Sequence, residues 1–358
     1  MPPVPNPLPR LIVYYQTHHT PSGQHISVLP LTQKEISLTH LIVAAIHINE
    51  DPSALTLNDH PPDHPRFTTL WAELRALQAC GIKVLGMLGG AAKGSYMRLD
   101  GDTETFERYY APLAQLVRER GLDGLDLDVE EEMSLRGIIR LIDRLRKDFG
   151  PEFIITLAPV ATAMTADLKR YNLSGFDYWE LERERGKEIA WYNVQFYCGW
   201  GHPSMYSRMA RRREKEFESL ADLDKWPARK LVVGLVTNPG NGNGFVEWQE
   251  LGSLLVQLAA SHESFGGVMG WEYFNSMPGA EPEPWRWAQM MTALLRGWTI
   301  EALPEGQQQA AAQQKVRSND GEAAMFHNEA DAEEDGQSEV AAPVPAEFEY
   351  HSDGTGDV

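Results

Sequence analysis

Short apolar segments recur along the first 300 residues of the chain and alternate with longer segments of helical periodicity. Eight of these short segments are rich in residues that favour β-strands, and their first residues lie 30 to 42 positions apart. The eight segments are Leu11–Tyr15, Leu41–Ile48, Ile82–Leu88, Leu122–Val129, Phe153–Val160, Ile189–Tyr197, Leu231–Val236 and Phe265–Trp271. Most of them are apolar at nearly every position, which is typical of parallel strands buried on both faces.

Amphipathic segments lie between most of the predicted strands. In Leu135–Phe149 the apolar residues recur with the three- and four-residue spacing of one helix face. Similar segments are Phe67–Cys80, Glu104–Arg120 and Leu251–His262. Eight strand–helix units in about 300 residues predict an α/β fold, a (β/α)8 barrel (TIM barrel) without a large insertion domain. A doubly wound open sheet is the alternative, but its first turn is usually rich in glycine, and residues 16–21 contain none.

The charge of the chain is unevenly distributed. The 358 residues carry a formal net charge of −19, and residues 301–358 alone hold 14 acidic and two basic residues, a net −12. This segment lacks tryptophan and is rich in Gln, Ala, Glu, Asp and Gly, a composition that predicts a disordered acidic tail. The chain therefore divides into a proline-rich lead at 1–9, a barrel at 10–300 and the tail.

Composition also limits the classes of partner and compartment. An acidic chain is not expected to bind nucleic acid or an anionic membrane surface. Two cysteines, Cys80 and Cys198, exclude a secreted scaffold held by many disulfides. The N-terminal residues contain no apolar segment of signal-peptide length, and no segment is long enough for a membrane helix. We expect a cytoplasmic protein, with unconventional secretion left open.

The fourth predicted strand carries three acidic residues on one face. Asp126, Asp128 and Glu130 alternate with apolar residues, so all three point into the predicted barrel. Three carboxylates in such a space cannot all ionise without cost, so at least one pKa should rise, as a general acid requires. A calcium loop is disfavoured by this alternation and by a missing loop glycine, whereas a magnesium site remains an alternative.

The segment Asp123–Glu130 resembles the DGxDxDxE motif of glycoside hydrolase family 18, which contains chitinases and endo-β-N-acetylglucosaminidases. The resemblance implies that Glu130 is the general acid and base, while the substrate's own acetamido oxygen attacks the anomeric carbon and forms an oxazolinium ion. It further implies that Asp128 orients the acetamido group and that Asp126 shares a proton with Asp128. Asp123 opens the motif and is placed with the substrate-binding residues. No cofactor or metal is implied.

Two other predicted strands carry residues that fit the same family. Asn193, Gln195 and Tyr197 share one face of the sixth strand, which resembles the family's QxY strand. The resemblance implies that the Tyr197 hydroxyl holds the attacking carbonyl oxygen and that Gln195 and Asn193 are further polar contacts. Trp271, on the eighth strand, resembles the tryptophan on which the substrate sugar stacks.

Further substrate contacts are expected from three other places along the chain. Gly89 and Gly90 end the third strand where the family has Ser-x-Gly-Gly, although Met87 occupies the serine position. Tyr15 is placed in the pocket from the first strand, with Tyr14 as the alternative, and Met164 is placed along the groove after the fifth strand.

The function predicted from the sequence is that of a retaining glycosidase acting on β-1,4-linked N-acetylglucosamine polymers or oligomers, as a chitinase does. An endo-β-N-acetylglucosaminidase that cleaves the chitobiose core of N-glycans is the alternative. A sugar-binding barrel without catalysis is a further alternative, which the presence of Glu130 disfavours. The expected partner is a glycan that contains N-acetylglucosamine.

Overall fold

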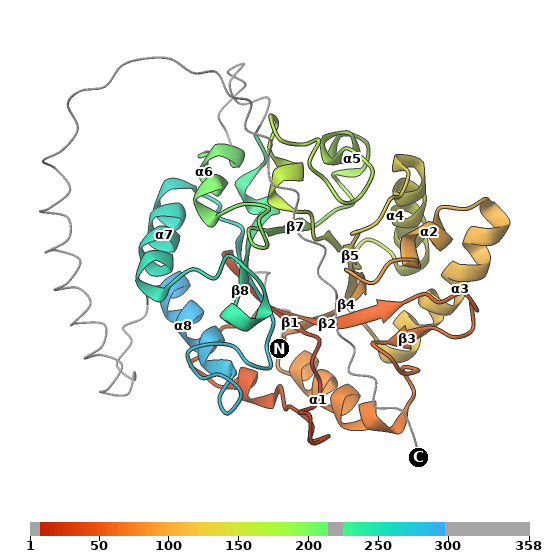
Figure 1. Cartoon of the computed structure of the whole chain (residues 1–358), viewed down its shortest axis with the longest axis horizontal. Coiled ribbons are helices and arrows are strands. Elements are labelled where there is room, and N and C mark those ends of the chain that lie inside the picture. The colour runs from red at the N-terminus through yellow and green to blue at the C-terminus, as the bar shows by residue number, and fades with distance from the viewer. Residues whose placement is uncertain (1–7, 214–224, 298–358) are drawn as a thin grey trace, which may run out of the picture. The chain divides into compact units, whose positions relative to one another are not determined.

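A closed barrel of eight parallel strands forms the centre of the molecule (Figure 1). The structure is a computed structural model that describes residues 8–213 and 225–297. The barrel strands are β1 (Arg10–Tyr15), β2 (His40–His47), β4 (Lys83–Gly89), β5 (Gly124–Asp128), β6 (Ile154–Leu157), β7 (Trp191–Gln195), β8 (Leu231–Val236) and β9 (Gly267–Trp271). Each strand pairs in parallel with the next, and β9 pairs with β1 to close the ring. The two-residue β3 (Thr56–Leu57) pairs antiparallel with β2.

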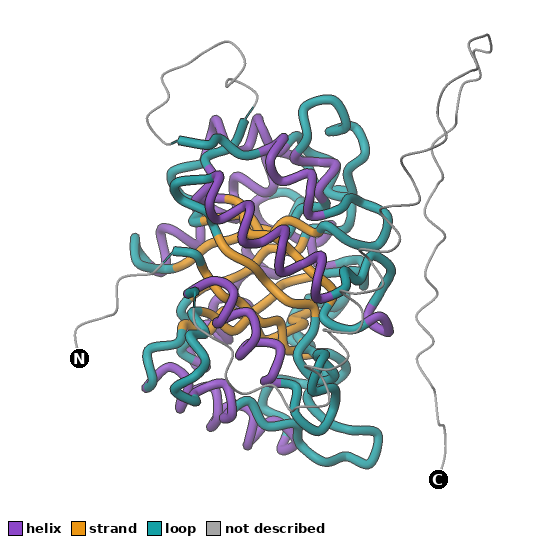
Figure 2. The backbone as a smooth tube through the Cα atoms, turned by 90° about the vertical axis from the view of Figure 1, so that its left-hand side faces the viewer, coloured by secondary structure: helices purple, strands orange, loops and turns teal. Residues whose placement is uncertain are grey.

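Helices surround the barrel, so that strands occupy the interior and helices the outside (Figure 2). The helices are α1 (Thr68–Ala79), α2 (Ser95–Leu99), α3 (Thr103–Arg120), α4 (Leu135–Phe149), α5 (Tyr178–Arg185), α6 (Tyr206–Met209), α7 (Trp248–Ser261) and α8 (Trp285–Arg296). Within the described ranges, no connection between strands folds as a separate domain. The predicted (β/α)8 barrel is confirmed, and all eight predicted strands overlap an observed barrel strand.

The helix α4 shows how local sequence sets these boundaries. Its N-cap is Ser134, whose hydroxyl accepts a hydrogen bond from the backbone N–H of Gly137 (3.0 Å). The residues that face the barrel include Ile138 and Leu145, both fully buried. Gly150 follows the last helical residue with a positive φ of 79°, a conformation that favours glycine. The observed helix begins and ends at the predicted residues.

Alternation along each strand divides the core into two clusters. Side chains that point outward pack under the helices, as Leu125 and Leu127 do. Side chains that point inward form a second cluster inside the barrel, which includes Ile12 and Ile42. A polar residue within a barrel strand therefore faces either the helices or the barrel interior, depending on its register.

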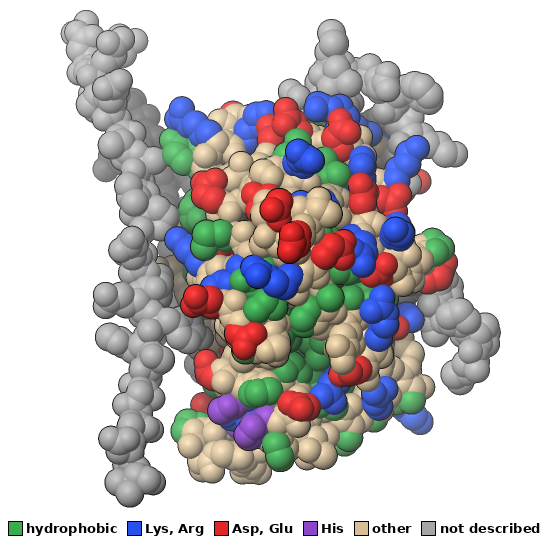
Figure 3. Space-filling view, turned by 90° about the vertical axis from the view of Figure 1, so that its right-hand side faces the viewer, with side chains coloured by type: hydrophobic (Ala, Val, Ile, Leu, Met, Phe, Trp, Pro, Cys, Tyr) green, Lys and Arg blue, Asp and Glu red, His purple; other side chains and the backbone are tan. Residues whose placement is uncertain are grey.

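The described surface is mixed in charge. Figure 3 shows that basic and acidic side chains are interspersed over one face of the molecule. No helix in the described part of the chain combines the length and apolar character needed to cross a membrane. The predicted acidic tail at 301–358 and most of the lead at 1–9 lie outside the described residues.

Candidate active site

The three acidic residues of the β5 segment lie together inside the barrel, as predicted. Asp126 and Asp128 belong to β5 and are buried, and Glu130 follows two residues beyond the strand and is partly exposed. Their faces are fixed because Leu125, Leu127 and Val129 all pack in the outer cluster. Glu130 is therefore at the carboxyl end of the barrel, which is where active sites of this fold are found.

Asp126 lies deepest and accepts hydrogen bonds from three other strands. Tyr14 on β1 donates from its hydroxyl to Oδ2 (2.7 Å). Thr156 on β6 and Asn193 on β7 donate to Oδ1, at 2.5 and 2.9 Å. Burial raises the pKa of Asp126, and the three hydrogen bonds oppose this rise, that from Thr156 most. The innermost residue of the site is thus a carboxylate that accepts hydrogen bonds from three neutral side chains.

Asp128 and Glu130 form a second unit above Asp126. The side-chain amide of Gln195 donates to Asp128 Oδ1 (3.2 Å) and to Glu130 Oε1 (3.0 Å). The same nitrogen also contacts the carbonyl oxygen of Ala158 (2.9 Å). Burial raises the pKa of Asp128 well above its ordinary value, and the charges of Glu130 and Asp126 raise it further. Burial also raises the pKa of Glu130. The pair is therefore suited to keeping a proton at a pH above the ordinary titration range of carboxyl groups.

The glycine pair at the end of β4 packs directly beside Asp128. The backbone N–H of Gly90 donates to the carbonyl oxygen of Asp128 (2.9 Å). Gly89 has a φ of +88°, and a Cβ there would lie 2.6 Å from that oxygen and 2.4 Å from the Tyr96 ring. Only glycine fits this close approach. Substrate contact by the glycine pair stays a prediction.

Tyr197 and Trp271 line the mouth of the barrel near the carboxylates. Tyr197 lies two residues beyond β7, and burial followed by the charges of Asp128 and Glu130 raises the pKa of its hydroxyl well above 10. Trp271 is the last residue of β9, is partly exposed, and meets the Tyr14 ring edge to face at 5.5 Å. A protonated hydroxyl and a partly exposed indole at this position are suited to holding a sugar amide and a sugar face.

Four of the residues predicted to bind substrate are not placed to do so. Two of these are Asn193 on β7 and Tyr15 on β1. Asn193 is fully buried, donates to Asp126 and accepts from the Trp191 indole N–H, so it has no exposed surface to offer a substrate. Tyr15 points outward, where its hydroxyl donates to the carbonyl oxygen of Ile26 (2.6 Å). Tyr14 is the residue of this strand that faces the interior, because adjacent strand residues point to opposite sides.

Asp123 and Met164 were also predicted to bind substrate, and both lie away from the carboxylates. Asp123 precedes β5 at the opposite end of the barrel, where it accepts hydrogen bonds from Lys83 Nζ (2.8 Å) and the backbone N–H of Val84 (2.9 Å). It therefore anchors the start of the strand and is remote from Glu130, which follows the other end of β5. Met164 has no exposed surface and packs in the outer cluster, which prevents it from touching a substrate.

Two further residues beside the carboxylates, Thr156 and Glu131, are not indicated by the family motifs. Thr156 interrupts an apolar predicted strand two residues before Ala158, and this polar interruption was the available signal. Glu131 is buried, with 7% of its surface exposed. Both of its carboxylate oxygens accept backbone N–H groups, from Gly94 (2.7 Å) and Tyr96 (2.8 Å). No sequence signal distinguished Glu131 from its exposed neighbour Glu132.

The loop after β8 is tied to the ends of β7 and β9. Asn241 and Asn275 form a reciprocal side-chain amide pair, at 2.9 and 2.8 Å. Asn241 also donates to the carbonyl oxygen of Trp271 (3.3 Å), and the backbone N–H of Cys198 donates to the carbonyl oxygen of Asn243 (2.7 Å). This network supports the strand ends that carry Tyr197 and Trp271.

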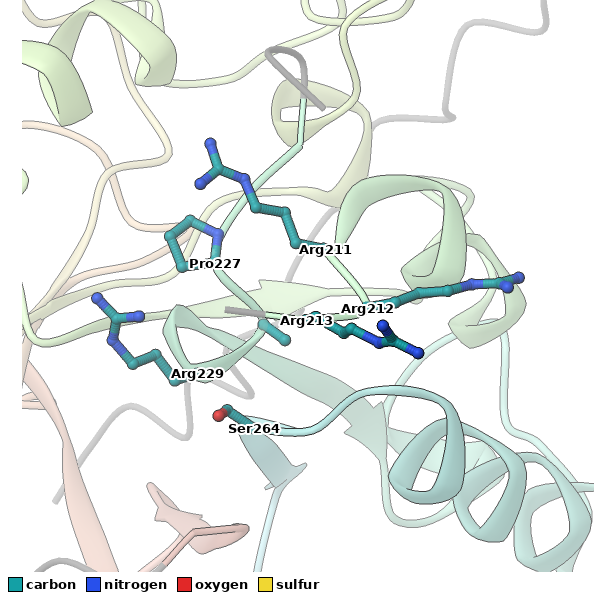
Figure 4. Close-up of a pocket in the computed structure, with 7 residues that line it drawn as sticks. Arg211, Arg212, Arg213, Pro227, Arg229 and Ser264 are labelled. Carbon is teal, nitrogen blue, oxygen red and sulfur yellow. The ribbon is translucent and has the colours of Figure 1, made fainter. Parts of the chain in front are cut away.

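A cavity lined by arginines lies at the other end of the barrel. Its volume is about 160 Å³, and its walls include Arg211, Arg229 and Ser264. Arg229 and Ser264 precede β8 and β9, so the cavity is on the amino-terminal side, and its arginine side chains diverge (Figure 4). It is distinct from the carboxylate cluster. Among residues 8–213 and 225–297, no group of three or more histidine, cysteine or acidic residues is arranged to hold a metal ion.

Comparison with known proteins identifies relatives of this chain. The model of the family described as Glycosyl hydrolases family 18 matches residues 10–241. Chitinase 2 of Rhizopus oligosporus is 27% identical over 214 residues, which are 56% of this chain and 36% of that protein. The chain thus spans little more than a third of the length of this curated relative.

Two solved structures are more similar in sequence. A fungal endo-β-N-acetylglucosaminidase of family 18 is 47% identical with a TM-score of 0.75, covering 82% of this chain and all of that one (100%). Chitinase ChiC from Aspergillus fumigatus is 54% identical with a TM-score of 0.69, covering 79% and 98%. The matched region contains the whole β5 carboxylate segment together with Gln195 and Tyr197. The chain therefore belongs to glycosyl hydrolases family 18, an enzyme family.

Proposed function

We propose that the protein is a retaining glycosidase that hydrolyses β-1,4 bonds after N-acetylglucosamine in chitin or chito-oligosaccharides. The observation that carries this proposal is the Asp128–Glu130 pair bridged by Gln195 at the carboxyl end of the barrel. The names of the Rhizopus and Aspergillus relatives, all chitinases, support it.

In the first step, Glu130 donates its proton to the glycosidic oxygen as that bond breaks. The acetamido carbonyl oxygen of the substrate forms a bond to the anomeric carbon, and an oxazolinium ion results. Asp128 accepts the acetamido N–H and balances the developing positive charge, and the Tyr197 hydroxyl donates to the attacking oxygen. Trp271 provides the apolar surface on which the reacting sugar rests.

In the second step, Glu130 removes a proton from water while the water oxygen attacks the anomeric carbon. The oxazolinium ring opens, the acetamide is restored, and the β configuration is retained. A nucleophile from the substrate agrees with the geometry, because Asp128 and Glu130 both contact the same Gln195 nitrogen. Retaining enzymes with a protein nucleophile instead place two carboxyl groups on either side of the reacting bond.

The second candidate is an endo-β-N-acetylglucosaminidase acting on the chitobiose core of N-glycans. It is favoured by the solved fungal enzyme of that name, which this chain matches with 47% identity over that enzyme's full length. Both reactions break the same type of bond with the same acid, and they differ in the glycan bound outside the reacting sugar.

Product analysis separates these functions. The full chain is incubated with chito-oligosaccharides and, in parallel, with a high-mannose glycopeptide, and the products are identified by mass spectrometry. Cleavage of the oligosaccharides supports the first function, and release of the glycan from the peptide supports the second. Binding of both substrates without turnover of either would show a non-catalytic barrel.

Two variants and one analogue test the mechanism within the same assay. Glu130→Gln should lower kcat by about 10²–10⁴-fold, the range for a lost general acid. Glu132→Gln is the matched control, since Glu132 is an exposed carboxylate two positions away. A substrate in which hydroxyl replaces the acetamide should not react, and efficient cleavage of it would exclude a nucleophile supplied by the substrate.

A further inference from the structure

Thr156 is a buried hydroxyl beside the deepest carboxylate of the site. It has no exposed surface, so it cannot contact a substrate. Its Oγ1 donates to Asp126 Oδ1 at 2.5 Å, the shortest of the three hydrogen bonds that Asp126 accepts. A hydrogen bond to an ionised carboxylate stabilises the charge more than one to a neutral group does.

The two strands beside β5 differ in what they offer Asp126. On β4, the residue in register with Asp126 is Met87, and on β6 it is Thr156. Met87 packs in the inner apolar cluster, and a thioether has no proton to donate. Of the two neighbouring strands, β6 alone therefore supplies a hydroxyl. The remaining donors, Tyr14 and Asn193, reach Asp126 from β1 and β7.

We propose that Thr156 is a positioning residue that keeps the charge on Asp126, so that the proton shared among the three carboxyl groups stays with Asp128 and Glu130. This inference rests on the proposed function, because only a reaction that uses Glu130 as an acid makes the location of that proton matter. Thr156 acts through Asp126 and touches neither substrate nor the reacting atoms.

The other titratable groups around Asp126 are one further acidic residue on β5 and four tyrosines. Asp128, two residues along the same strand, has a pKa raised well above its ordinary value by burial and by the charges of Glu130 and Asp126. The tyrosines that face the carboxylates are Tyr14 on β1, Tyr96 on α2, Tyr178 on α5 and Tyr197 after β7. Burial raises the pKa of each of them above 10, so all four stay neutral in the range where carboxyl groups titrate.

The test compares Thr156→Val with Thr156→Ser in the full chain, using pH profiles of kcat/KM on a chito-oligosaccharide. Valine keeps the shape of threonine and removes the hydroxyl, whereas serine keeps the hydroxyl. Loss of the donor makes Asp126 bind a proton more tightly. The acid limb of the profile should therefore move to higher pH by about one unit, a tenfold change in proton affinity. KM should stay within about twofold, since Thr156 does not touch substrate, and Thr156→Ser should keep the wild-type acid limb.

Two results for the acid limb of the pH profile would overturn the inference. An acid limb in Thr156→Val that coincides with wild type, or an equal shift in Thr156→Ser, would show that the hydroxyl does not control Asp126. If Thr156→Val does not fold, Thr156→Ala makes the same deletion and is judged against Thr156→Ser in the same way. Wild-type turnover is measured first, so that failure of the proposed glycosidase activity is recognised separately from failure of the role of Thr156.

Discussion

Substitution of Glu131 by alanine tests the most unexpected contact near the site. Both carboxylate oxygens of Glu131 are used, one by the N–H of Gly94 (2.7 Å) and one by that of Tyr96 (2.8 Å). Tyr96 is fully buried, and its hydroxyl donates to the carbonyl oxygen of Leu88 (2.6 Å) on β4. Glu131, the residue after the proposed acid Glu130, thus ties the end of the β5 segment to the loop that follows β4.

The expected loss in the free energy of unfolding follows from the two N–H groups that alanine would leave without a partner. A buried donor without a partner costs about 1–3 kcal/mol, so the pair should cost about 2–4 kcal/mol after partial relaxation. For a domain of this size, about 2 °C of Tm is lost for each kcal/mol, which gives a fall in Tm of roughly 4–8 °C.

The assay is thermal and urea unfolding of the full chain, followed by circular dichroism. Glu132→Ala is the matched control, because Glu132 is exposed, and its free energy of unfolding should stay within about 0.5 kcal/mol of wild type. A loss in Glu131→Ala no larger than that in Glu132→Ala would refute the reasoning, since the two N–H groups would then have found other partners.

Three further predictions concern the carboxyl pair and the loop network. Asp128→Asn should raise Tm at neutral pH, because it removes a carboxyl group whose pKa is raised in the folded protein. The protonated Asp128 side chain stabilises the fold below about pH 3.8, and this contribution is lost as the pH rises through the folded-state pKa. The gain in Tm should therefore be small in acid and larger at about pH 7. The alkaline limb of kcat/KM should lie above the ordinary glutamate value of 4.5, because activity needs the proton on the pair and burial raises the pKa of Glu130; a limb at or below 4.5 would contradict this. Asn241→Ala removes the amide pair with Asn275 and the bond to the Trp271 carbonyl, so KM should rise several-fold, with about 1 kcal/mol lost in unfolding experiments; an unchanged KM would show that the loop does not hold the tryptophan.

The strand and helix pattern was predictable because buried parallel strands and amphipathic helices leave regular apolar spacings. The helix at Leu135–Phe149 matches at both ends, since a serine N-cap and a following glycine mark its limits. The acids on β5 were also predictable, because alternate strand residues share a face whatever the fold around them. The cytoplasmic location and the character of residues 301–358 stay predictions.

The errors arose where a motif or strand pattern does not specify position in three dimensions. Asp123 and Glu130 open and close one motif, yet at about 3.3 Å per residue their positions lie roughly 20 Å apart, at opposite ends of the barrel. Tyr14 and Tyr15 are chemically equal neighbours on β1, and both are buried. Only the closure of β1 against β9 and β2 decides which of them faces inward.

The sequence by itself determined the barrel, the three acids on one face and the family. These features depend on local periodicity or on a contiguous motif, and both are written along a single segment. The tertiary structure alone decided which residues hold those acids: Tyr14 from β1, Thr156 from β6 and the amides of Asn193 and Gln195 from β7. The physical reason is that a buried carboxylate takes its hydrogen bonds from whichever strands the closed barrel brings within 3 Å or so, and these strands are distant in sequence.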